Sequence, residues 1–356
     1  MHRETLTQAR RLVVKLGTGV LTYSRKQPDL AQMGQLVAQV AAAHAQDREV
    51  VLVTSGAVGA GMGVLGYEKR PSDLSELQAC AAVGQSRLMA MYEKLFAENG
   101  LKVAQVLLTH EDLEHHERHL NARNTLVSLL RHGVVPVINE NDTTSFTELK
   151  FGDNDQLSAL VACLLPADLL VILTTVDGLI ENFGKANPKT VRLVENLESV
   201  ERMAGGTTSA TAVGGMTSKL QAARIVMRSG IPLVIALGRK KTALTEVLAG
   251  REEGTLFVPK PTRLTGRKRW IAFFHHPKGT LTVDDGAKQA LREKGKSLLP
   301  PGVARCDGDF SAGEVVRICD LNGLEFARGI CDFDAAQVRT RTLREVLVHR
   351  DNLVIL

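Results

Sequence analysis

The alternation of two kinds of apolar segment constrains the fold more than any other feature of this chain. Short continuous apolar runs, which are typical of strands buried on both faces of a parallel sheet, alternate with longer segments of helical apolar spacing. The short runs occupy residues 12–14, 49–54, 102–109, 134–138, 168–173 and 232–237. Such alternation implies helices on both faces of the sheet. We therefore predict an α/β fold, an αβα sandwich around a mainly parallel sheet.

Composition narrows the class of protein. At roughly 150 residues per domain, 356 residues suggest two or three domains. The apolar content of 44% and charged content of 23% are typical of a globular protein, and only 4% aromatic residues predict an aliphatic core. The N-terminus lacks a signal-peptide pattern, and no run of about 18 apolar residues occurs, so we expect no membrane span. The five cysteines form no Cys-x-x-Cys pair, which argues against a zinc or disulfide framework and fits the cytoplasm.

The last quarter of the chain differs in composition. Residues 250–269 are rich in proline, glycine and basic residues, and short strand-like runs with turn signals follow them. We expect strands at 270–274, 281–283, 314–319 and 325–330, and a helix at 284–294. We predict domains at 1–258 and 270–356 with a linker at 259–269. The net charge is +5 over the whole chain, which is only a weak indication of a nucleic-acid partner.

Two glycine-containing loops each carry a lysine. Lys15 follows the first apolar run and precedes Gly17 and Gly19, whereas Lys219 ends the segment Gly-Gly-Met-Thr-Ser-Lys at the expected start of a helix. Glycines let the backbone approach a phosphate, and a lysine or a helix N-terminus favours its negative charge. We predict anion sites at both loops, at the carboxyl edge of the sheet. The alternatives are an ordinary turn at Lys15 and a flexible linker ahead of Lys219.

A third candidate anion site begins at Ser55, where a glycine-rich segment follows the second apolar run. A helix starting there has unpaired N–H groups at its first turn; the alternative is a tightly packed helix of small residues. Residues 61–66 match Gly-x-Gly-x-x-Gly, but they begin seven residues after Thr54, so we do not expect a dinucleotide fingerprint.

Two polar clusters lie beside apolar segments. Residues 139–142 (Asn-Glu-Asn-Asp) directly follow the fourth apolar run, and residues 153–155 (Asp-Asn-Asp) precede an apolar helix. A helix cap explains one such residue, but it does not explain two clusters, so we predict a functional role. His115 and His119 share a helical face. Because the zinc spacing His-Glu-x-x-His is absent, we expect a solvated charged face there.

Seven segments in order resemble the amino acid kinase family over about residues 10–258. They read Val-Val-Lys-Leu-Gly-Thr, Val-Thr-Ser-Gly-Ala, Ala-Ala-Val-Gly-Gln-Ser-Arg-Leu, Leu-Asn-Ala-Arg-Asn-Thr, Val-Pro-Val-Ile-Asn-Glu-Asn-Asp, Gly-Asp-Asn-Asp and Gly-Gly-Met-x-x-Lys-Leu-Gln-Ala-Ala. The C-terminal part resembles a PUA domain through Arg-Lys-Arg-Trp, Ser-Leu-Leu-Pro, Gly-Glu-Val-Val-Arg-Ile and Val-His-Arg-Asp. The ordered set is far more specific than any single glycine motif.

The resemblance implies an activity and a set of roles. The activity is ATP-dependent phosphorylation of the L-glutamate side chain to L-glutamyl 5-phosphate, the first step of proline biosynthesis, with Mg²⁺ carried on the ATP phosphates. The implied catalytic residues are Lys15, Lys219 and Asp155, and the implied glutamate ligands are Ser55, Asp142 and Asn154. The implied nucleotide-binding residues are Lys15, Thr174, Thr175, Gly214, Gly215, Met216, Thr217, Ser218 and Lys219. The chain departs from the family where it has Thr175 in place of a frequent aspartate and Val213 in place of a frequent threonine.

The resemblance also implies partners. They are proline as a feedback inhibitor near residues 143–151, a glutamyl phosphate reductase that takes the product, further copies of the chain in a dimer or tetramer, and RNA at the PUA-like part. Two other functions remain open at this stage. One is a kinase for another carboxylate, such as acetylglutamate or aspartate, against which the PUA-like tail argues. The other is an RNA-binding regulator, against which the intact set of Lys15, Asp155 and Lys219 argues.

Overall fold

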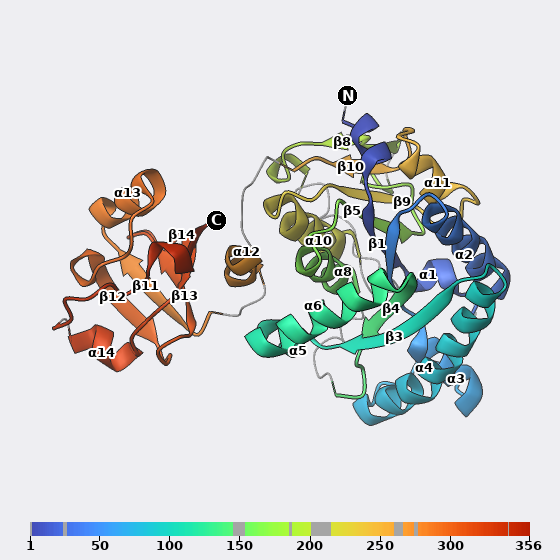
Figure 1. Cartoon of the computed structure of the whole chain (residues 1–356), viewed down its shortest axis with the longest axis horizontal. Helices are drawn as coiled ribbons and strands as arrows, with labels where there is room; N and C mark the ends of the chain where they lie inside the picture. The colour runs from blue at the N-terminus through green and yellow to red at the C-terminus, as the bar shows by residue number, and fades with distance from the viewer. Residues whose placement is uncertain are drawn as a thin grey trace. The chain divides into compact units, whose positions relative to one another are not determined.

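The computed structural model describes residues 2–23, 27–144, 154–184, 187–200, 215–259, 266–273, 277–340 and 342–356. The chain divides into two compact units, Met1–Thr262 and Arg263–Leu356 (Figure 1). The first unit is a helix-covered, mainly parallel sheet and the second is β-rich, so the predicted fold class is confirmed. None of the helices within these ranges is long and apolar enough to cross a membrane.

An eight-stranded sheet forms the centre of the first unit, in the order β3-β4-β2-β1-β5-β9-β10-β8. The strands are β1 (Arg11–Leu16), β2 (Glu49–Val53), β3 (Lys102–Leu108), β4 (Val134–Glu140), β5 (Leu169–Thr174), β8 (Leu193–Val194), β9 (Leu233–Leu237) and β10 (Thr255–Phe257). Neighbouring strands are parallel except β10, which runs antiparallel to β9. A separate short hairpin pairs β6 (Ile180–Glu181) with β7 (Lys189–Thr190).

The strand order defines where a ligand is expected. After β1 the chain builds one side of the sheet with β2, β3 and β4, and after β5 it builds the other side with β9 and β10. The direction of the connections therefore reverses between the adjacent strands β1 and β5. In open α/β sheets, ligands bind outside the carboxyl ends of the strands at such a reversal.

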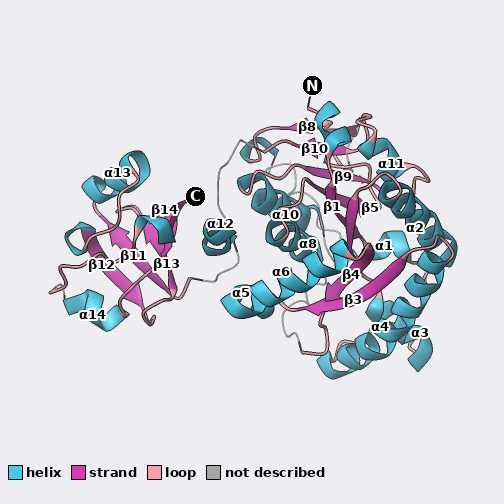
Figure 2. Ribbon diagram, viewed as in Figure 1, coloured by secondary structure: helices cyan, strands magenta, loops and turns pink. Residues whose placement is uncertain are grey.

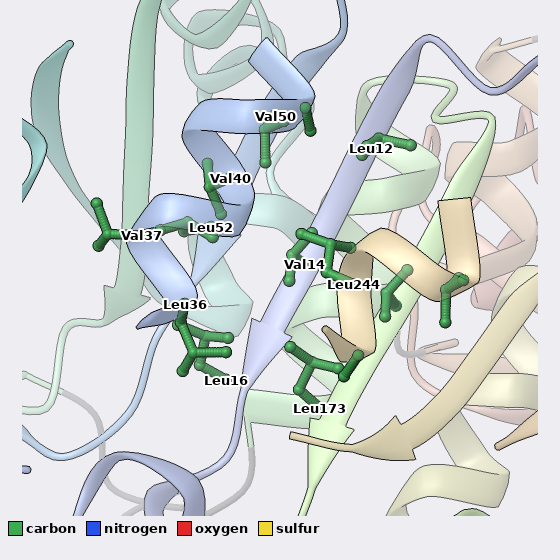
Figure 3. Packing of buried hydrophobic residues seen from close by; sticks show 14 of the residues in the cluster. Leu12, Val14, Leu16, Leu36, Val37, Val40, Val50, Leu52, Leu173 and Leu244 are labelled. Atoms are coloured by element: carbon green, nitrogen blue, oxygen red, sulfur yellow. The ribbon is translucent and has the colours of Figure 1, made fainter. Parts of the chain in front are cut away.

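Helices cover both faces of this sheet (Figure 2). They are η1 (Glu4–Gln8), α1 (Thr18–Leu21), α2 (Leu30–His44), α3 (Ala57–Leu65), α4 (Leu74–Ala97), α5 (His110–Glu114), α6 (His116–Arg131), α8 (Asn154–Leu164), α10 (Met216–Arg228) and α11 (Ala243–Leu248). Helices α2, α4 and α11 share one core with alternate residues of β1, β2 and β5, while α6, α8 and α10 lie over the other face. Figure 3 shows Leu16 of β1 beside Leu36 of α2, and Val14 of β1 beside Leu244 of α11.

Small residues set the contact between α3 and α4. A β-carbon on Gly61 would lie 1.8 Å from the carbonyl oxygen of Cys80, and one on Gly84 would lie 1.7 Å from that of Ala57. Real β-carbons do not approach carbonyl oxygens this closely, so both positions require glycine. Gly61 of the glycine-rich segment after Ser55 therefore serves the packing of α3 against α4.

The second unit contains a five-stranded sheet in the order β12-β11-β13-β14-β15. Its strands are β11 (Gly279–Val283), β12 (Val303–Gly308), β13 (Val315–Cys319), β14 (Glu325–Ile330) and β15 (Leu353–Ile355). Its helices are α12 (Gly266–Phe273), α13 (Asp285–Lys294), η2 (Pro300–Gly302), α14 (Ala335–Thr340) and η3 (Arg350–Asn352). A core of its own, which includes Leu281, Ile318 and Phe326, fills the interior.

The predicted strand at 270–274 is wrong, because Trp270 to Phe273 belong to helix α12. Trp270, Ile271 and Ala272 are all buried, and the Arg328 guanidinium donates to the Ala272 carbonyl oxygen at 3.0 Å. A short apolar run reads alike in a buried strand and in a buried helix, so periodicity could not separate them.

Two further predictions need correction. The apolar pattern predicts a fourth strand that ends at residue 138, but β4 continues through Asn139 and Glu140, because the ladder with β3 pairs both residues. The helical segment after β3 is broken at His115 into α5 and α6. This break lets His119 fold back to Leu113, whose carbonyl oxygen lies 3.2 Å from the imidazole Nδ1. His119 is consequently buried and not part of a solvated face.

Candidate active site

The predicted site residues gather at the carboxyl ends of the central strands. Lys15 lies at the end of β1, Thr174 ends β5, and Ser55 follows β2. Asn154 and Asp155 begin α8, and Lys219 lies in the first turn of α10. Segments from both halves of the first unit therefore meet at the edge where the strand order reverses.

One buried carboxylate joins two lysines from opposite ends of the kinase-like sequence. The Lys15 Nζ lies 2.6 Å from Asp155 Oδ1, and the Lys219 Nζ lies 2.9 Å from Asp155 Oδ2. The Ser218 hydroxyl also donates to Oδ2, at 3.0 Å. Asp155 is 0% exposed and each lysine is 5% exposed. We call Lys15, Asp155, Lys219 and Ser218 the lysine cluster.

The electrostatics of the lysine cluster favour an anionic ligand. Burial alone raises the pKa of Asp155, but the charges of Lys15 and Lys219 outweigh it, and the pKa is lowered well below its ordinary value. The carboxylate therefore stays ionised, and two ammonium groups with one carboxylate leave one net positive charge. An ionised carboxylate held in this way is a poor base, so Asp155 can hold the lysines in place but cannot accept a proton at neutral pH.

The segments that follow β1, β5 and β9 approach each other closely. The Gly17 N–H donates to the Leu173 carbonyl oxygen at 3.0 Å, and the Gly238 N–H donates to that of Thr174 at 2.8 Å. A β-carbon on Gly19 would lie 2.7 Å from the Thr175 methyl group. Thr175 is exposed beside this loop, so the side chain that borders the loop is uncharged.

Helix α10 presents its first turn to the same region. Gly215 is the N-cap, and Met216, Thr217 and Ser218 are the first helical residues. The first N–H groups of a helix have no partner within the helix and suit a phosphate. Gly214 and Val213 lie outside the described residues.

A second cluster lies next to the lysine cluster, at the ends of β2 and β4. The Asn154 amide nitrogen donates to the Thr54 carbonyl oxygen and, at 2.8 Å, to Asn139 Oδ1; the Ser55 hydroxyl oxygen lies 3.4 Å away. Ser55 and Asn154, both predicted as substrate ligands, are thus brought together. Ser55 reaches this position because Gly56 follows it with φ of +105°, which turns the chain from β2 into α3.

Asp142 is half-buried two residues beyond β4. Its charge acts on Arg70: burial lowers the pKa of that guanidinium, while Asp142 opposes the shift. Arg70 therefore brings a positive charge to Asp142, which is predicted to bind the substrate. The sequence analysis did not single out Arg70. The segment 145–153, which follows directly and carries most of the predicted inhibitor region, lies outside the described residues.

Sequence reasoning gave no individual role to four further residues that build this site. Asn139 and Thr54 contact Asn154, Gln85 contacts Asn139, and the Tyr92 hydroxyl lies 2.7 Å from the Thr54 hydroxyl. Asn139 was recognised only as part of a polar cluster. Gln85 lies in one of the seven segments that resemble the family, and this resemblance was the only sequence feature that could have indicated a role for it.

No group of three or more histidine, cysteine or acidic residues that could hold a metal ion occurs in the part of the chain that is described. In phosphoryl transfer, substrate phosphates and water usually supply most Mg²⁺ ligands, and the expectation that Mg²⁺ is carried on the ATP phosphates stays a prediction.

The fold and the lysine cluster define a class of protein, and comparison with known proteins agrees. Residues 10–237 match the amino acid kinase family, and residues 279–349 match the PUA domain. Two solved structures share the fold: a carbamate kinase from Giardia lamblia bound to AMP-PNP (TM-score 0.52, 16% identity, covering 71% of this chain and 100% of that one) and a UMP kinase from Bacillus anthracis (TM-score 0.50, 15% identity, covering 72% and 99%). The chain belongs to the amino acid kinase family.

Within that family the chain groups with the glutamate 5-kinases along its whole length. It is 46% identical to the glutamate 5-kinase of Geobacter sulfurreducens, with 100% of both chains covered. It is 47% identical to that of Moorella thermoacetica, over 99% of this chain and 98% of the relative. Similarity of this extent includes both units, so the PUA domain is shared with these relatives.

Proposed function

We infer that this chain transfers the γ-phosphoryl group of ATP to the side-chain carboxylate of L-glutamate, which is the first step of proline biosynthesis. The observation that carries this proposal is the lysine cluster at the carboxyl edge of the sheet, in a chain that aligns from end to end with glutamate 5-kinases. The cluster offers positive charge to phosphates without offering a base. A carboxylate acceptor suits such a site better than a hydroxyl acceptor does.

The chemistry explains why no base is required. A glutamate side chain has a pKa of about 4.3 and is ionised at neutral pH. One of its oxygens forms the new bond to the γ-phosphorus while the bond from that phosphorus to the ADP oxygen breaks, and ADP leaves. Repulsion between the carboxylate and the triphosphate is the main obstacle, and phosphoryl transfer depends on positioning and charge stabilisation. Lys15 and Lys219 would neutralise the phosphate oxygens, and Asp155 would hold both lysines at the correct spacing.

The remaining roles follow from position. The first turn of α10, from Met216 to Ser218, would hold nucleotide phosphates, and Thr174 and Thr175 would border the nucleotide. Ser55 and Asn154 would contact glutamate. Asp142, with Arg70 close to it, would contact the part of glutamate that lies farther from the lysine cluster. Mg²⁺ would arrive with ATP and supply further positive charge to the phosphates. Omitting Mg²⁺ should abolish turnover, and activity in its absence would contradict this role.

The decisive experiment is ATP turnover with L-glutamate in the presence of hydroxylamine, which traps an acyl phosphate as a hydroxamate. We expect hydroxamate to form only with glutamate, ATP and Mg²⁺ together. A panel containing acetylglutamate and aspartate tests the other carboxylate substrates. Higher kcat/KM for either of them than for glutamate would overturn the proposal.

Membership of this family also supports proposals about regulation and partners. Proline would inhibit at a site near residues 143–151, and millimolar proline that leaves turnover unchanged would exclude this. A glutamyl phosphate reductase would take the reactive product, and an increased rate of the coupled reaction on mixing the two enzymes would support this.

The enzyme would act in the cytoplasm as a homodimer or homotetramer, and light scattering would give its mass. The PUA domain would bind RNA, which retention at physiological salt tests.

A further inference from the structure

A row of four amide side chains leads from the outside of the first unit to Asn154. The Gln85 amide nitrogen on α4 donates to Gln105 Oε1 on β3 at 3.0 Å. The Asn139 nitrogen donates to Gln85 Oε1 at 2.8 Å, and the Asn154 nitrogen donates to Asn139 Oδ1 at 2.8 Å. We call Gln105, Gln85, Asn139 and Asn154 the amide row.

The contact of Asn154 with the Thr54 carbonyl oxygen, at the inner end of the amide row, determines which atom of each amide donates. The Asn154 nitrogen also donates to the Thr54 carbonyl oxygen, and a carbonyl oxygen can only accept. Turning the Asn154 amide over would place its oxygen against the Thr54 oxygen, and the same reversal would pass to Asn139 and Gln85. Thr54 itself is 0% exposed and is held by its hydrogen bond to the buried Tyr92 hydroxyl.

The fixed direction decides what Asn154 presents to a ligand. Both hydrogens of its amide nitrogen are directed to protein acceptors, on Thr54 and Asn139. The group left for a ligand is the carbonyl oxygen Oδ1, which is an acceptor. An ammonium group is a donor only, so an amino acid can bind this oxygen through its α-ammonium group, whereas a dicarboxylate without the amine cannot.

We infer that Gln85 and Asn139 are positioning residues that orient the Asn154 amide and thereby select substrates carrying an α-ammonium group. The inference rests on the proposed phosphorylation of glutamate. It assigns a role to the Ala-Ala-Val-Gly-Gln segment of α4, which does not contact the lysine cluster in any described hydrogen bond or ion pair. Without the acceptor on Gln85, the Asn139 amide loses the partner that holds its oxygen toward Asn154. The Thr54 carbonyl oxygen still accepts one hydrogen of the Asn154 amide, but the acceptor on Asn139 for the second hydrogen is no longer fixed, so the position of Asn154 Oδ1 is less well defined.

The test compares two substitutions at one position. Gln85→Met removes the acceptor while keeping the length of the side chain, whereas Gln85→Glu keeps an acceptor for Asn139. We expect Gln85→Met to raise the KM for L-glutamate about tenfold, with kcat and the KM for ATP within about twofold of wild type, since a misplaced hydrogen bond to a charged group changes affinity by about this factor. Gln85→Glu should stay within about twofold of wild type by the same argument. Gln35→Met, at a half-buried glutamine of α2, is the matched control.

Glutarate, which is glutamate without the amino group, provides a second readout. Its inhibition constant against glutamate should be the same in wild type and Gln85→Met, because it has no ammonium group to lose. An unchanged KM for glutamate in Gln85→Met, an equal rise in Gln85→Glu, or a parallel weakening of glutarate would each overturn the inference. Wild-type enzyme without glutamate-dependent turnover would instead overturn the proposed function, and this inference with it.

Discussion

At the residue scale, the central feature is a single carboxylate shared by two buried lysines. Lys15 and Lys219 are separated by about two hundred positions in the sequence, and each would be costly to bury alone. Asp155 makes their burial possible and leaves the cluster positive. In the proposed reaction the site would provide charge for a phosphate without exposing two lysine side chains to water.

Replacing either lysine by alanine should lower kcat by roughly 10²- to 10³-fold, because each would stabilise charge on the transferring phosphoryl group. The KM for glutamate should change much less, since its ligands lie in the neighbouring cluster. Steady-state kinetics on Lys15→Ala and Lys219→Ala measures both quantities. Lys240→Ala, at an exposed lysine paired with Glu253, is the control. Near-normal kcat in either cluster variant would contradict the role of the lysine cluster.

Asp155→Asn should destabilise the first unit by about 3–5 kcal/mol, because it leaves two buried ammonium groups without their counter-charge. Asp177→Asn breaks a more exposed pair with Arg192 and should cost no more than about 1 kcal/mol. Urea unfolding of both variants against wild type gives the comparison. If both variants lost the same free energy of unfolding, the buried ion pairs of Asp155 would be no more important for stability than the exposed pair of Asp177.

The same substitution has a defined pH dependence. The pKa of Asp155 is about 3.9 in an unfolded chain and is lower in the folded protein. A carboxylate with a depressed folded-state pKa stabilises the fold above its unfolded pKa, and this contribution is lost as the pH falls from there through the folded-state value. The stability difference between wild type and Asp155→Asn should therefore be constant from pH 8 to about pH 5 and shrink below about pH 4. A difference that already shrinks between pH 7 and pH 5 would contradict this titration.

At the scale of single elements, periodic apolar spacing predicted most strands and helices. Features that depend on contacts with residues far away in the sequence were not predicted. The central strands and the helices α2, α4 and α10 follow from apolar spacing, which the finished fold retains. The lysines and the polar clusters could be recognised from the sequence because charged and polar residues directly beside buried strands are unusual unless they have a function. Gln85 was not visible, because its role depends on Asn139, which lies 54 positions away. The run at Trp270 was misread because a single buried turn has no period to distinguish it from a strand.

The glycine-lined contact of α3 with α4 gives a prediction at this scale. Gly61→Ala places a methyl group against the backbone of Cys80, so it should cost about 1–3 kcal/mol through overpacking. Gly63→Ala lies on the same helix, where the nearest atoms to an added β-carbon belong to the Gln27 side chain at 3.8 Å or more. Alanine should favour the helix there by up to about 1 kcal/mol. Thermal unfolding of the two variants should shift in opposite directions, and a shift in the same direction would contradict this account of the packing.

At the scale of the whole molecule, the proposed active site and the PUA domain belong to separate compact units. Every described residue of the lysine cluster, the amide row and the loops after β1 and β5 lies within Met1–Thr262. The second unit has its own sheet and its own core. Each unit therefore has the buried apolar interior that independent folding requires.

A chain ending at residue 262 should accordingly fold and phosphorylate glutamate. We expect its kcat to lie within a few-fold of the full-length value, because none of the described site residues is removed. RNA retention, if the full-length protein has it, should be lost. Circular dichroism separates loss of folding from loss of function, and a chain of residues 263–356 gives the reciprocal test of RNA retention. A truncated chain that is folded but inactive would mean that the second unit contributes to catalysis, through a contact or an assembly that the first unit cannot make alone.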